Sequence, residues 1–538
     1  MRPAGRGELD SLYFTYPHFS APAADASLAD DAPVAIVGAG PVGLTAALTL
    51  ARFGVRSVVL EARSTYNDGS RAICVARQSF HILEAAGAVA PFLDKALGWT
   101  TGRTFYRGRQ ILEFAMPDSA DEKFRPMYNL QQQYIERFLH EAALATGLVD
   151  IRWQTEVTGV GDGEAGVVVS VRDPHRAYDL KAGWAIAADG ARSAVRAMRG
   201  KRLRGENHEG RYVIADIRMA HNYPTIRRAL FDPACRRGGT VLIHCQPDDI
   251  WRIDYQLGEG ESAETATREE NVRASVAGVL AEIGHDGPWE LEWWSAYSAN
   301  TLALDDYRDS RVFFAGDSAH IVPIFGVRGL NNGLADAENI GWKLASVIAG
   351  AAGEGLLDSY TPERRGATLD VFANAVKSTR FMTPPTRGHR LMRDAALSLA
   401  LGHPFAGEFA NPRQMTPYTY AESPLTVADR DAFEFGPSPG AVATEIRLGD
   451  GFLSDHFGRG FTVLAFGRLE GAEAISEAGI ALIALPAGGR IAEVYGARNG
   501  TAYLLRPDRH VAARWHGADG AEIARTLATI LDRKGKAK

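Results

Sequence analysis

The chain has 538 residues, of which 46% are hydrophobic and 23% are charged, and its formal net charge at pH 7 is −6. This composition is that of a folded globular protein and excludes a disordered or fibrous chain. Because the net charge is negative, the sequence shows no excess of basic residues that would indicate nucleic-acid binding. Because the sequence has only 3 cysteines and no Cys-x-x-Cys pair, we expect no metal site and a reduced, cytoplasmic protein.

The first 31 residues are predicted to form an N-terminal extension. They contain Tyr13, Phe14, Tyr16 and Phe19, followed by a run rich in Ala and Asp. A signal peptide requires a basic segment and then a continuous apolar segment, and neither is found there. No stretch approaches about 18 uninterrupted apolar residues, so we also expect no membrane-spanning helix and no membrane partner.

A strand, a glycine-rich turn and a helix follow this extension. The apolar strand ends at Val37, G-A-G-P-V-G comes next, and a helix then leads to a second strand that ends at Glu61. In such a β-α-β unit Gly38 makes the tight turn, Gly40 lets the backbone approach a pyrophosphate, and Gly43 lets the helix pack on the strand. Glu61 lies near the offset expected for a carboxylate that binds a ribose diol. The sequence therefore predicts a dinucleotide site.

A second G-x-G-x-x-G match, at residues 161–166, serves as an internal control. Strand-like VVVSV follows it instead of a helix, so this match predicts a hairpin turn. The neighbouring segments are predicted to be a helix over 130–146 and strands over 151–160, 167–171 and 184–188. From 211 to 294 the pattern changes to alternating strands, interrupted by one helix near 267–283. This predicts a sheet domain inserted between nucleotide-binding segments.

Residues 311–343 read RVFFAGDSAHIVPIFGVRGLNNGLADAENIGWK. An apolar strand runs into G-D, then a glycine-containing loop, then an amphipathic helix predicted from about Gly333. Such a loop offers backbone N–H groups at a helix N-terminus to a phosphate or to the edge of an electron-rich ring. Asp317 adds a carboxylate for sugar hydroxyls, and Gly326 and Gly329 let a flat ligand approach the backbone. The segment therefore suits a nucleotide-like cofactor.

The rest of the chain is predicted to be helical to about Leu401, after which 6 prolines between Pro404 and Pro439 mark a long connection. Strands predicted at 461–466, 480–485 and 501–505, with a final helix at 520–532, indicate a small separate α/β domain.

Three signatures now stand in order: G-A-G-P-V-G at 38–43, A-D-G-A-R-S at 188–193 and G-D-S-A-H at 316–320. With the strand-rich insertion they resemble the FAD-dependent aromatic hydroxylases, the single-component group A flavoprotein monooxygenases, over about residues 32–400. The segment Tyr106–Arg109 and the run YNLQQQYIE are similar to the phenol hydroxylase and 3-(3-hydroxyphenyl)propionate hydroxylase-like branch. LRPDRHVAARW at 505–515 resembles the thioredoxin-like domain of that branch.

The fold that this resemblance implies is α/β: a Rossmann-like FAD-binding domain with an inserted mixed β-sheet substrate domain, a helical region and a C-terminal thioredoxin-like domain. The expected division is 1–31 for the N-terminal extension, 32–210 for the first part of the FAD-binding domain, 211–300 for the β-sheet substrate domain, 301–403 for the second part and the helical region, 404–440 for a linker and 441–538 for the thioredoxin-like domain. Without Cys-x-x-Cys, this last domain is expected to serve packing or the contact of a homodimer.

FAD is the cofactor that the resemblance implies. In the family pattern the glycine-rich turn binds the pyrophosphate, Glu61 the ribose, Asp317 the ribityl chain, and Gly329 to Asn331 line the isoalloxazine ring. For Arg71 and Gln132 the alternative is a solvated helix face. The implied cofactor-binding residues are Gly38, Gly40, Pro41, Val42, Gly43, Glu61, Ala62, Arg63, Arg71, Gln132, Val157, Asp317, Gly329, Leu330 and Asn331.

The activity that the resemblance implies is hydroxylation of a phenolic or related aromatic small molecule. FAD would be reduced by NAD(P)H, O2 captured as a flavin C4a-hydroperoxide, and one hydroxyl transferred to the ring. Asp189 and Arg192 match a motif linked with both FAD and NAD(P)H, and nicotinamide binding would be transient. Two alternatives stay open: an FAD-dependent oxidoreductase that dehydrogenates or oxidatively rearranges its substrate, and an inactive flavin-binding partner protein.

A phenol reacts best as its phenolate, so a side chain must withdraw its proton. Phenol hydroxylases carry an aspartate just after their R-A pair, where this chain has Ile73. The catalytic candidates are therefore sought in the inserted sheet: His244 and, on the neighbouring strand, Arg252 and Tyr255. The competing interpretation is a satisfied structural histidine, a surface arginine and a core tyrosine.

Residues 311–343, called the flavin-loop segment below, depart from the family pattern at two places. Ile324 follows Pro323 where the family often has a second proline, and Val327-Arg328 replaces a G-Q or A-K pair. These changes predict a pocket of different shape. Arg328 could pair with a substrate carboxylate or with protein, and His320 could bond local backbone.

Overall fold

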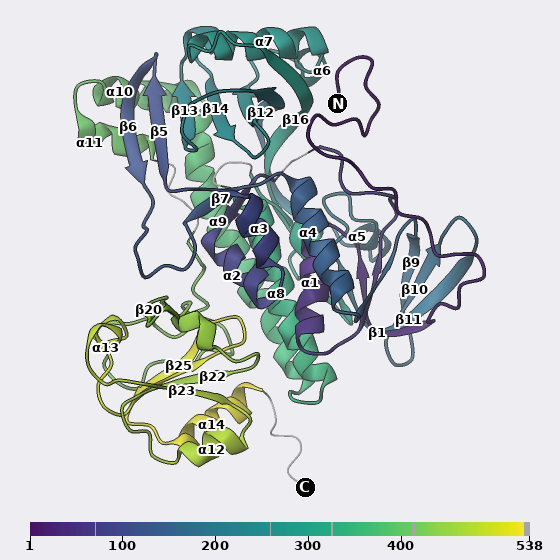
Figure 1. Ribbon diagram of the computed structural model, residues 1–538, viewed down its shortest axis with the longest axis vertical. Helices are drawn as coiled ribbons and strands as arrows, with labels where there is room; N and C mark the ends of the chain where they lie inside the picture. Colours follow the sequence, from purple (N-terminus) through teal and green to yellow (C-terminus); the bar gives the residue numbers. More distant parts are fainter. Residues whose placement is uncertain (70–71, 259, 324–326, 412–415, 532–538) are drawn as a thin grey trace.

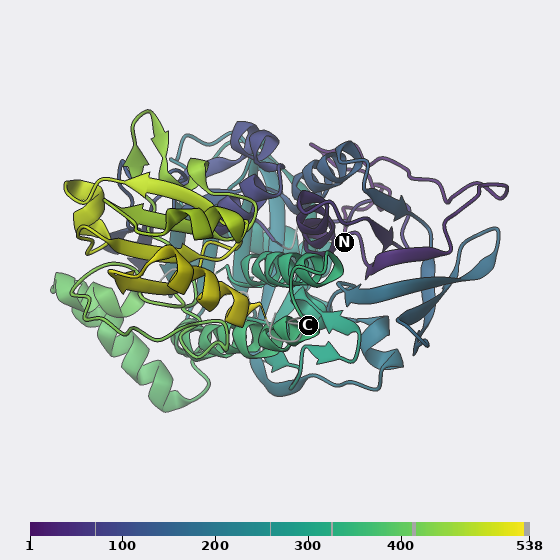
Figure 2. The same cartoon turned by 90° about the horizontal axis from the view of Figure 1, so that it is seen from below.

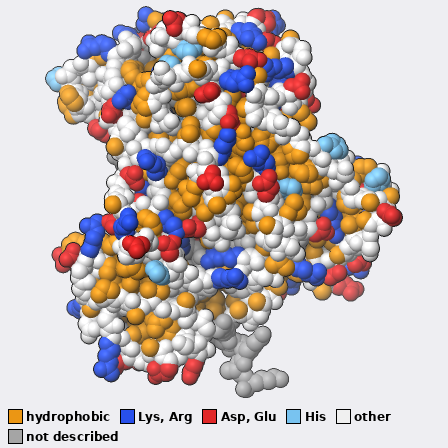
Figure 3. Space-filling view, viewed as in Figure 1, with side chains coloured by type: hydrophobic (Ala, Val, Ile, Leu, Met, Phe, Trp, Pro, Cys, Tyr) orange, Lys and Arg blue, Asp and Glu red, His pale blue; other side chains and the backbone are white. Residues whose placement is uncertain are grey.

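The computed structural model describes residues 1–69, 72–258, 260–323, 327–411 and 416–531. Figure 1 shows a central α/β body, a sheet lobe at one end of the long axis and a C-terminal lobe at the other. Over these ranges, every helix is too short or too polar to cross a bilayer. Figure 3 shows cationic and anionic side chains interspersed over the face in view, in keeping with the small net charge.

The first sheet has 8 strands and contains the predicted β-α-β unit. Strands β18, β11, β1, β2 and β8 run parallel. Their apolar runs are buried, as expected for a parallel sheet that is covered on both faces. The order is β17 (Arg308–Asp309), β18 (Val312–Phe314), β11 (Ala177–Ala187), β1 (Asp31–Val37), β2 (Ser57–Leu60) and β8 (Val149–Arg152), and β9 (Glu156–Asp162) and β10 (Val167–Arg172) form a hairpin that pairs with β11. The predicted hairpin turn at 161–166 is thus confirmed.

Helices cover this sheet, and two of them, α8 and α4, pack on α1 (Figure 1). The close approach of α8 to α1 needs Gly341, because a Cβ atom there would lie 2.7 Å from Thr49. The helical segments of this body are α1 (Pro41–Arg52), α2 (Arg77–Ala85), α3 (Val89–Lys95), α4 (Gln132–Ala145), α5 (Ala194–Met198), η2 (Gly316–Ser318), α8 (Gly329–Ile348) and η3 (Glu354–Ser359). A small three-stranded sheet lies beside them, in the order β3 (Cys74–Ala76), β7 (Met127–Asn129) and β4 (Leu97–Trp99).

The second sheet forms the other lobe and is wider than the predicted range 211–300. Its order is β19 (His320–Ile321), β16 (Trp289–Ala303), β12 (Arg204–Met219), β15 (Ile250–Gln256), β14 (Thr240–Cys245), β13 (Arg227–Phe231), β5 (Thr101–Tyr106) and β6 (Arg109–Ala115). The hairpin β5–β6 comes from the segment assigned to the FAD-binding domain and joins through parallel pairing of β5 with β13. That pairing joins distant parts of the chain, so no local pattern reveals it.

Helices cover both faces of the second sheet. The first set packs on one face through Val272, Val276 and Leu280, and consists of η1 (Ala234–Arg236), α6 (Ala263–Ala266) and α7 (Glu269–Glu282). On the other face, Met382 and Leu397 pack against Phe231 and Leu242. This second set is α9 (Tyr360–Met382), α10 (Arg387–Ala400), α11 (Pro404–Gly407) and η4 (Glu408–Ala410).

The C-terminal domain has a four-stranded sheet with the order β23-β22-β24-β25. Strands β22 and β23 are parallel, and the other pairs are antiparallel. The elements are β20 (Arg447–Leu448), β21 (Gly451–Phe452), η5 (Leu453–His456), β22 (Thr462–Phe466), α12 (Ala472–Glu477), β23 (Ala481–Leu485), α13 (Arg490–Val494), β24 (Thr501–Leu505), β25 (Val511–His516) and α14 (Gly520–Ile530). A β-α-β unit followed by β-β-α supports the thioredoxin-like assignment, which stays a prediction.

The predicted linker 404–440 is not a free connection. The N–H of Val427 donates to Ala512 O at 2.8 Å, and Arg514 Nε donates to Asp429 Oδ1 at 2.9 Å. The N–H of His516 donates to Asp431 Oδ2 at 2.7 Å. The later part of this segment therefore packs as an outer layer of the C-terminal domain (Figure 2).

The N-terminal extension packs across both sheet lobes. Phe19 stacks on Trp153 with ring centroids 4.2 Å apart, beside the first sheet. Arg2 pairs with Glu292 of β16 at 2.6 Å. The extension thus ties the two sheets together on one side.

Buried ion pairs join α8, α9 and the C-terminal domain. The carboxylate of Glu363 on α9 accepts from Lys343 Nζ at 2.7 Å and from Arg506 Nη1 at 2.6 Å, with all three side chains fully buried. Arg506 Nη2 also donates to Asp508 at 2.6 Å. Burial acts to raise the pKa of Glu363, but Arg506 and Lys343 hold it well below its usual value. These ion pairs thereby fix the C-terminal domain to α8 and α9.

Candidate functional site

The glycine-rich turn lies between the end of β1 and the start of α1. Gly38 has φ +104°, and a Cβ atom there would lie 2.6 Å from Ala188 O, so only glycine fits. A Cβ on Gly43 would lie 2.0 Å from Gly38 O, whereas one on Gly40 would meet nothing within 4 Å. The start of α1 has no side-chain cap and no acid in its first turn. Open space beside uncapped N–H groups fits an anionic pyrophosphate.

Glu61 lies at the end of β2 and is 5% exposed. Its Oε2 accepts from the N–H of Ala39 at 2.8 Å, and its Oε1 accepts from Arg63 Nε at 2.9 Å. The carboxylate therefore lies beside the glycine turn, as a ribose ligand would. Ala62 is exposed next to it.

The flavin-loop segment brings three elements together. Val42 of α1 contacts both η2 and α8, because Cβ atoms on Gly316 and Gly333 would lie 2.9 and 2.7 Å from its side chain. The N–H of Gly316 donates to Asp336 Oδ2 at 2.9 Å, and Asp317 is exposed at this junction. The dinucleotide turn and the predicted ribityl ligand thus lie at one place.

Helix α8 begins at Gly329, four residues before the predicted start at Gly333. The side chain of Asn331 explains the earlier start, because Nδ2 donates to Val327 O at 2.6 Å and Oδ1 accepts from Ala76 N at 2.8 Å. Gly329, Leu330 and Asn331 thus form the first turn of the helix. The preceding Val327 has φ +54°, a strained conformation for a β-branched residue.

The other predicted cofactor residues are spread around this junction. Gln132 begins α4, and its Oε1 accepts from Ala72 N at 3.3 Å. Val157 is buried in β9. Arg71, Ile324 and Gly326 lie outside the described residues.

The A-D-G-A-R-S motif follows β11, next to Gly38. Asp189 Oδ2 accepts from Val195 N at 3.0 Å, while its buried Oδ1 has no hydrogen-bond partner among the residues described. Burial raises the pKa of this carboxyl. Arg192 is exposed at the surface.

A row of polar side chains crosses the second sheet on the face toward β3. The strand registers place His244 beside Arg252 and Arg252 beside Asp216, and continuing the register of β13 and β14 by one pair places Arg227 beside His244. Arg252 Nη2 donates to Asp216 Oδ2 at 2.8 Å, and both are buried. Arg252 is therefore not a surface residue. Burial, together with Arg227 and Arg252, lowers the pKa of His244 to about 3, so its ring is neutral.

Tyr255 does not belong to this row. It lies three residues from Arg252 on the same strand, so its side chain points to the opposite face. There it packs with Ile253 and the α7 side chains. The prediction that Tyr255 shares a site with His244 and Arg252 is wrong, and the competing interpretation of a core tyrosine holds.

Asp254 was missed by the sequence reasoning and lies on the face of the row, two residues from Arg252. It is buried, and its Oδ1 has no partner among the described side chains and backbone. Burial raises its pKa to about 7, against the opposing effect of Arg252. A carboxyl group that titrates near neutral pH can act as a general base.

Cys74 connects this row to the start of α8. Asn331 Nδ2 donates to Cys74 O at 3.1 Å. Burial raises the pKa of the Cys74 thiol to about 12, and the charges of Arg227, Arg252 and Asp254 also act on it. The polar row thus faces the strand that touches the predicted flavin-ring end.

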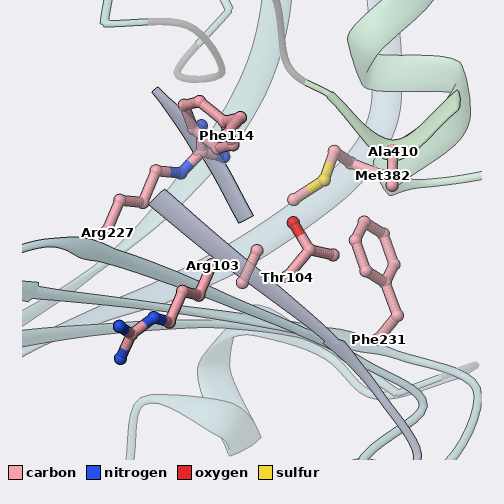
Figure 4. Close-up of a pocket in the computed structure, with 8 residues that line it drawn as sticks. Arg103, Thr104, Phe114, Arg227, Phe231, Met382 and Ala410 are labelled. Atoms are coloured by element: carbon pink, nitrogen blue, oxygen red, sulfur yellow. The ribbon is translucent and has the colours of Figure 1, made fainter. Parts of the chain in front are cut away.

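A cavity of about 10 Å³, the space of one water molecule, opens on the same sheet face beside Arg227. Figure 4 shows Thr104 and Phe231 from the sheet turned toward Met382 at the end of α9. The cavity therefore lies between the sheet and its helical cover.

His320 is fully buried and takes part in a structural network. Its Nε2 lies 2.6 Å from Asp336 Oδ2, and Arg364 Nε donates to Asp336 Oδ1 at 2.6 Å. Burial acts to raise the pKa of Asp336, but His320 and Arg364 hold it below its usual value. Within the described ranges, no group of three or more potential ligand side chains is placed to hold a metal ion.

Comparison with known proteins gives a family match. Residues 31–375 match the family model described as FAD binding domain. A 3-(3-hydroxy-phenyl)propionate/3-hydroxycinnamic acid hydroxylase from Mycobacterium sp. (strain JLS) is 29% identical over 68% of this chain, and the match spans only 62% of the length of that relative. A rifampicin monooxygenase from Streptomyces venezuelae is 29% identical over 91% of this chain and 96% of the relative.

Solved structures match nearly the whole chain. The flavin-dependent monooxygenase PieE, in complex with FAD and substrate, has a TM-score of 0.77 and 24% identity, covering 93% of this chain and 99% of the other. Aklavinone-11 hydroxylase, in a ternary complex with FAD and aklavinone, has a TM-score of 0.75 and 25% identity over 93% and 99%. These likenesses extend through the C-terminal domain.

Proposed function

Because this chain belongs to the FAD-binding domain family, we propose that it is an FAD-dependent monooxygenase that hydroxylates a phenolic or related aromatic small molecule with NAD(P)H and O2. The observation that carries the proposal is the buried polar row Arg227–His244–Arg252, with Asp254, facing the strand that touches the start of α8. The similarity to a rifampicin monooxygenase over 91% of the chain supports an oxygenase.

The residues at the glycine turn and the flavin-loop segment fit FAD. Gly38, Gly40 and Gly43 would admit the pyrophosphate at the start of α1, and Glu61 would accept from the ribose. Asp317 would accept from the ribityl chain, and the first turn of α8 would line the ring. When bound, FAD supplies the electron transfer and oxygen activation, and the chain binds it, orients it and excludes water.

The polar row has the chemistry to handle a phenol. Asp254 in its ionised form would take the proton of the hydroxyl group, and the guanidinium of Arg227, which has an unpartnered Nε, would stabilise the resulting phenolate. Neutral His244 would donate or accept a hydrogen bond without adding charge. The sheet thus supplies the acidic group that Ile73 does not provide.

NAD(P)H would approach transiently near Asp189 and Arg192, since one Rossmann fingerprint is in place. The C-terminal domain would contribute packing or the contact of a homodimer. A cytoplasmic location fits the reduced cysteines.

The proposal is tested by NAD(P)H oxidation with a panel of phenols. FAD-loaded enzyme is expected to show a flavin spectral shift with some of these phenols and faster NAD(P)H oxidation with the same ones. If none of the panel shifts the spectrum or stimulates oxidation, the hydroxylase proposal fails.

Asp317→Ala is expected to weaken FAD binding about 10- to 100-fold, since hydrogen bonds to a charged group contribute about 1.5–3 kcal/mol. Because Asp317 is exposed, the truncation leaves no cavity, and the fold should persist. The FAD-to-protein ratio after purification measures the effect. Asp450→Ala, at an exposed site in the C-terminal domain, is the matched control. Equal FAD content in both variants would remove Asp317 from the site.

A further inference from the structure

The loop that follows Glu61, residues 62–69, is contacted by the N-terminal extension at two points. Near the start of the loop, the N–H of Phe19 donates to Ser64 O at 2.7 Å. Near its end, Arg2 Nη2 donates to Asp68 Oδ1 at 2.8 Å. The extension therefore holds both ends of the segment that leads away from the proposed ribose carboxylate.

This 62–69 loop carries the side chains that orient Glu61. Arg63 Nε donates to Glu61 Oε1 at 2.9 Å, and Arg63 Nη1 also donates to Asn67 Oδ1. Asn67 is itself fixed, because its N–H and its Nδ2 donate to the buried carboxylate of Glu136 on α4 at 2.8 and 2.6 Å. A ligand side chain is oriented by its hydrogen-bond partners and by the groups that hold those partners. The placement of Glu61 thus depends on the placement of the loop.

Arg2 links this loop to the second sheet. Its side chain is 3% exposed, and its Nη1 donates to Glu292 Oε1 of β16 at 2.6 Å. The buried carboxylate of Glu292 also accepts from Ser11 Oγ at 2.7 Å and from the N–H of Leu12 at 2.8 Å. Charge-assisted hydrogen bonds of this kind are strong, so the guanidinium has a fixed position from which to hold Asp68.

The end of the 62–69 loop also packs directly on β16. Gly69 has φ +74°, and a Cβ atom there would lie 2.0 Å from the ring of Trp293, so only glycine fits. Glu292 and Trp293 are consecutive residues of β16. The ion pair of Arg2 and the ring of Trp293 therefore fix the same end of the loop against the same strand.

Arg6 of the same extension gives a comparison for Arg2. It donates to Glu290, and its Nη1 lies 3.6 Å from Glu292 Oε2. Among the described residues, both of its ion-pair partners are thus carboxylates of β16, and neither is in the loop. Arg6 ties the extension to the sheet, whereas Arg2 ties the sheet to the loop.

We propose that Arg2 is a positioning residue for FAD: through Asp68 it holds the 62–69 loop, and thereby the carboxylate of Glu61, where the adenosine ribose binds. The inference rests on the FAD site of the proposed function and is independent of what the enzyme hydroxylates. Arg2 acts through the loop and is not itself a ligand of the cofactor.

The test follows FAD release from diluted holoenzyme by the change in flavin fluorescence. Arg2→Met is expected to release FAD about 10-fold faster than wild type, within the usual range of coupling between contacting residues. Arg2→Lys keeps the positive charge and should recover part of this loss. Arg6→Met is the matched control and should release FAD as wild type does. Release from Arg2→Met that is no faster than from Arg6→Met would overturn the proposal.

A double-mutant cycle shows whether Arg2 acts through Asp68. Asp68→Asn keeps the size of the side chain and should speed FAD release about as much as Arg2→Met. The double variant should release FAD no faster than either single variant, because both substitutions remove one ion pair. Thermal unfolding of each holoenzyme shows that the variants are folded. Effects that simply add in the double variant would contradict the proposed route.

An FAD analogue that lacks the adenosine 2′-hydroxyl separates positioning of Glu61 from a general loosening of the fold. Wild type should release this analogue faster than FAD, since the carboxylate loses a hydrogen bond to the ribose. In Arg2→Met the two cofactors should leave at nearly equal rates, and a difference as large as in wild type would overturn the proposal. Holoenzyme that meets these expectations but hydroxylates no phenol would support the role of Arg2 and count only against the proposed function.

Discussion

Replacing Asp254 by asparagine is expected to lower kcat/KM for a phenolic substrate about 10²- to 10⁴-fold, the usual contribution of a general base. The substitution keeps the size of the side chain and removes the group that would take the phenol proton. The pKa of Asp254 is raised to about 7, so the ionised, active form is lost as pH falls through that value. The wild-type kcat/KM should therefore decrease below about pH 7, and Asp254→Asn should lack this acid limb.

Tyr255→Phe is the matched control, since Tyr255 lies on the same strand but points to α7. It should retain the wild-type pH profile. The profile is measured by initial rates of product formation across pH. An Asp254→Asn variant with wild-type kcat/KM and the same acid limb would show that another group takes the proton.

Arg506→Met is expected to destabilise the protein by about 3–5 kcal/mol, because breaking a buried ion pair leaves uncompensated buried charge. Arg506 bonds both Glu363 and Asp508, and none of these side chains is more than 3% exposed. Among the residues that the structure describes, Lys343 would then be the one cationic partner of Glu363. The midpoint of denaturant unfolding, followed by tryptophan fluorescence, measures the loss.

Arg468→Met, at an exposed site of the same domain, is the control and should unfold as wild type does. The Arg506 variant should also lose the docking of the C-terminal domain first, as increased proteolysis between that domain and α9. Unfolding of Arg506→Met at the wild-type midpoint would mean that the ion pairs do not hold the domain in place.

The β-α-β unit could be predicted from the sequence because its signals are local. The apolar strand before Gly38, the helix after Gly43 and the strand that ends at Glu61 follow one another directly, and the structure confirms this order. The hairpin at 161–166 was separated from this unit by the strand pattern that follows it. Long-range pairing had no such signal, so β5 and β6 were assigned to the wrong lobe.

The start of α8 shows how packing overrides propensity. Gly329 and the two asparagines after Leu330 are weak helix formers, which favoured a loop up to Gly333. The side-chain amide of Asn331 instead forms hydrogen bonds with the backbone of Ala76 and Val327, and these bonds fix the first turn.

The polar row can be predicted only in part from the sequence. Side chains alternate between the two faces of a strand, and on the strand of Arg252 residues three apart cannot share a face. Applied there, the rule separates Tyr255 from Arg252 and selects Asp254. Burial of Asp254 and the pairing of Arg252 with Asp216 depend on the register of distant strands, which no local pattern supplies.

Labelled oxygen tests the central claim most directly. FAD-loaded enzyme is supplied with NAD(P)H, ¹⁸O₂ and each phenol that stimulates NAD(P)H oxidation, and the product is analysed by mass spectrometry. The proposed function predicts one labelled oxygen atom in a ring-hydroxylated product, in proportion to the NAD(P)H consumed. Product without label, or NAD(P)H oxidation that yields only hydrogen peroxide across the whole panel, would contradict it.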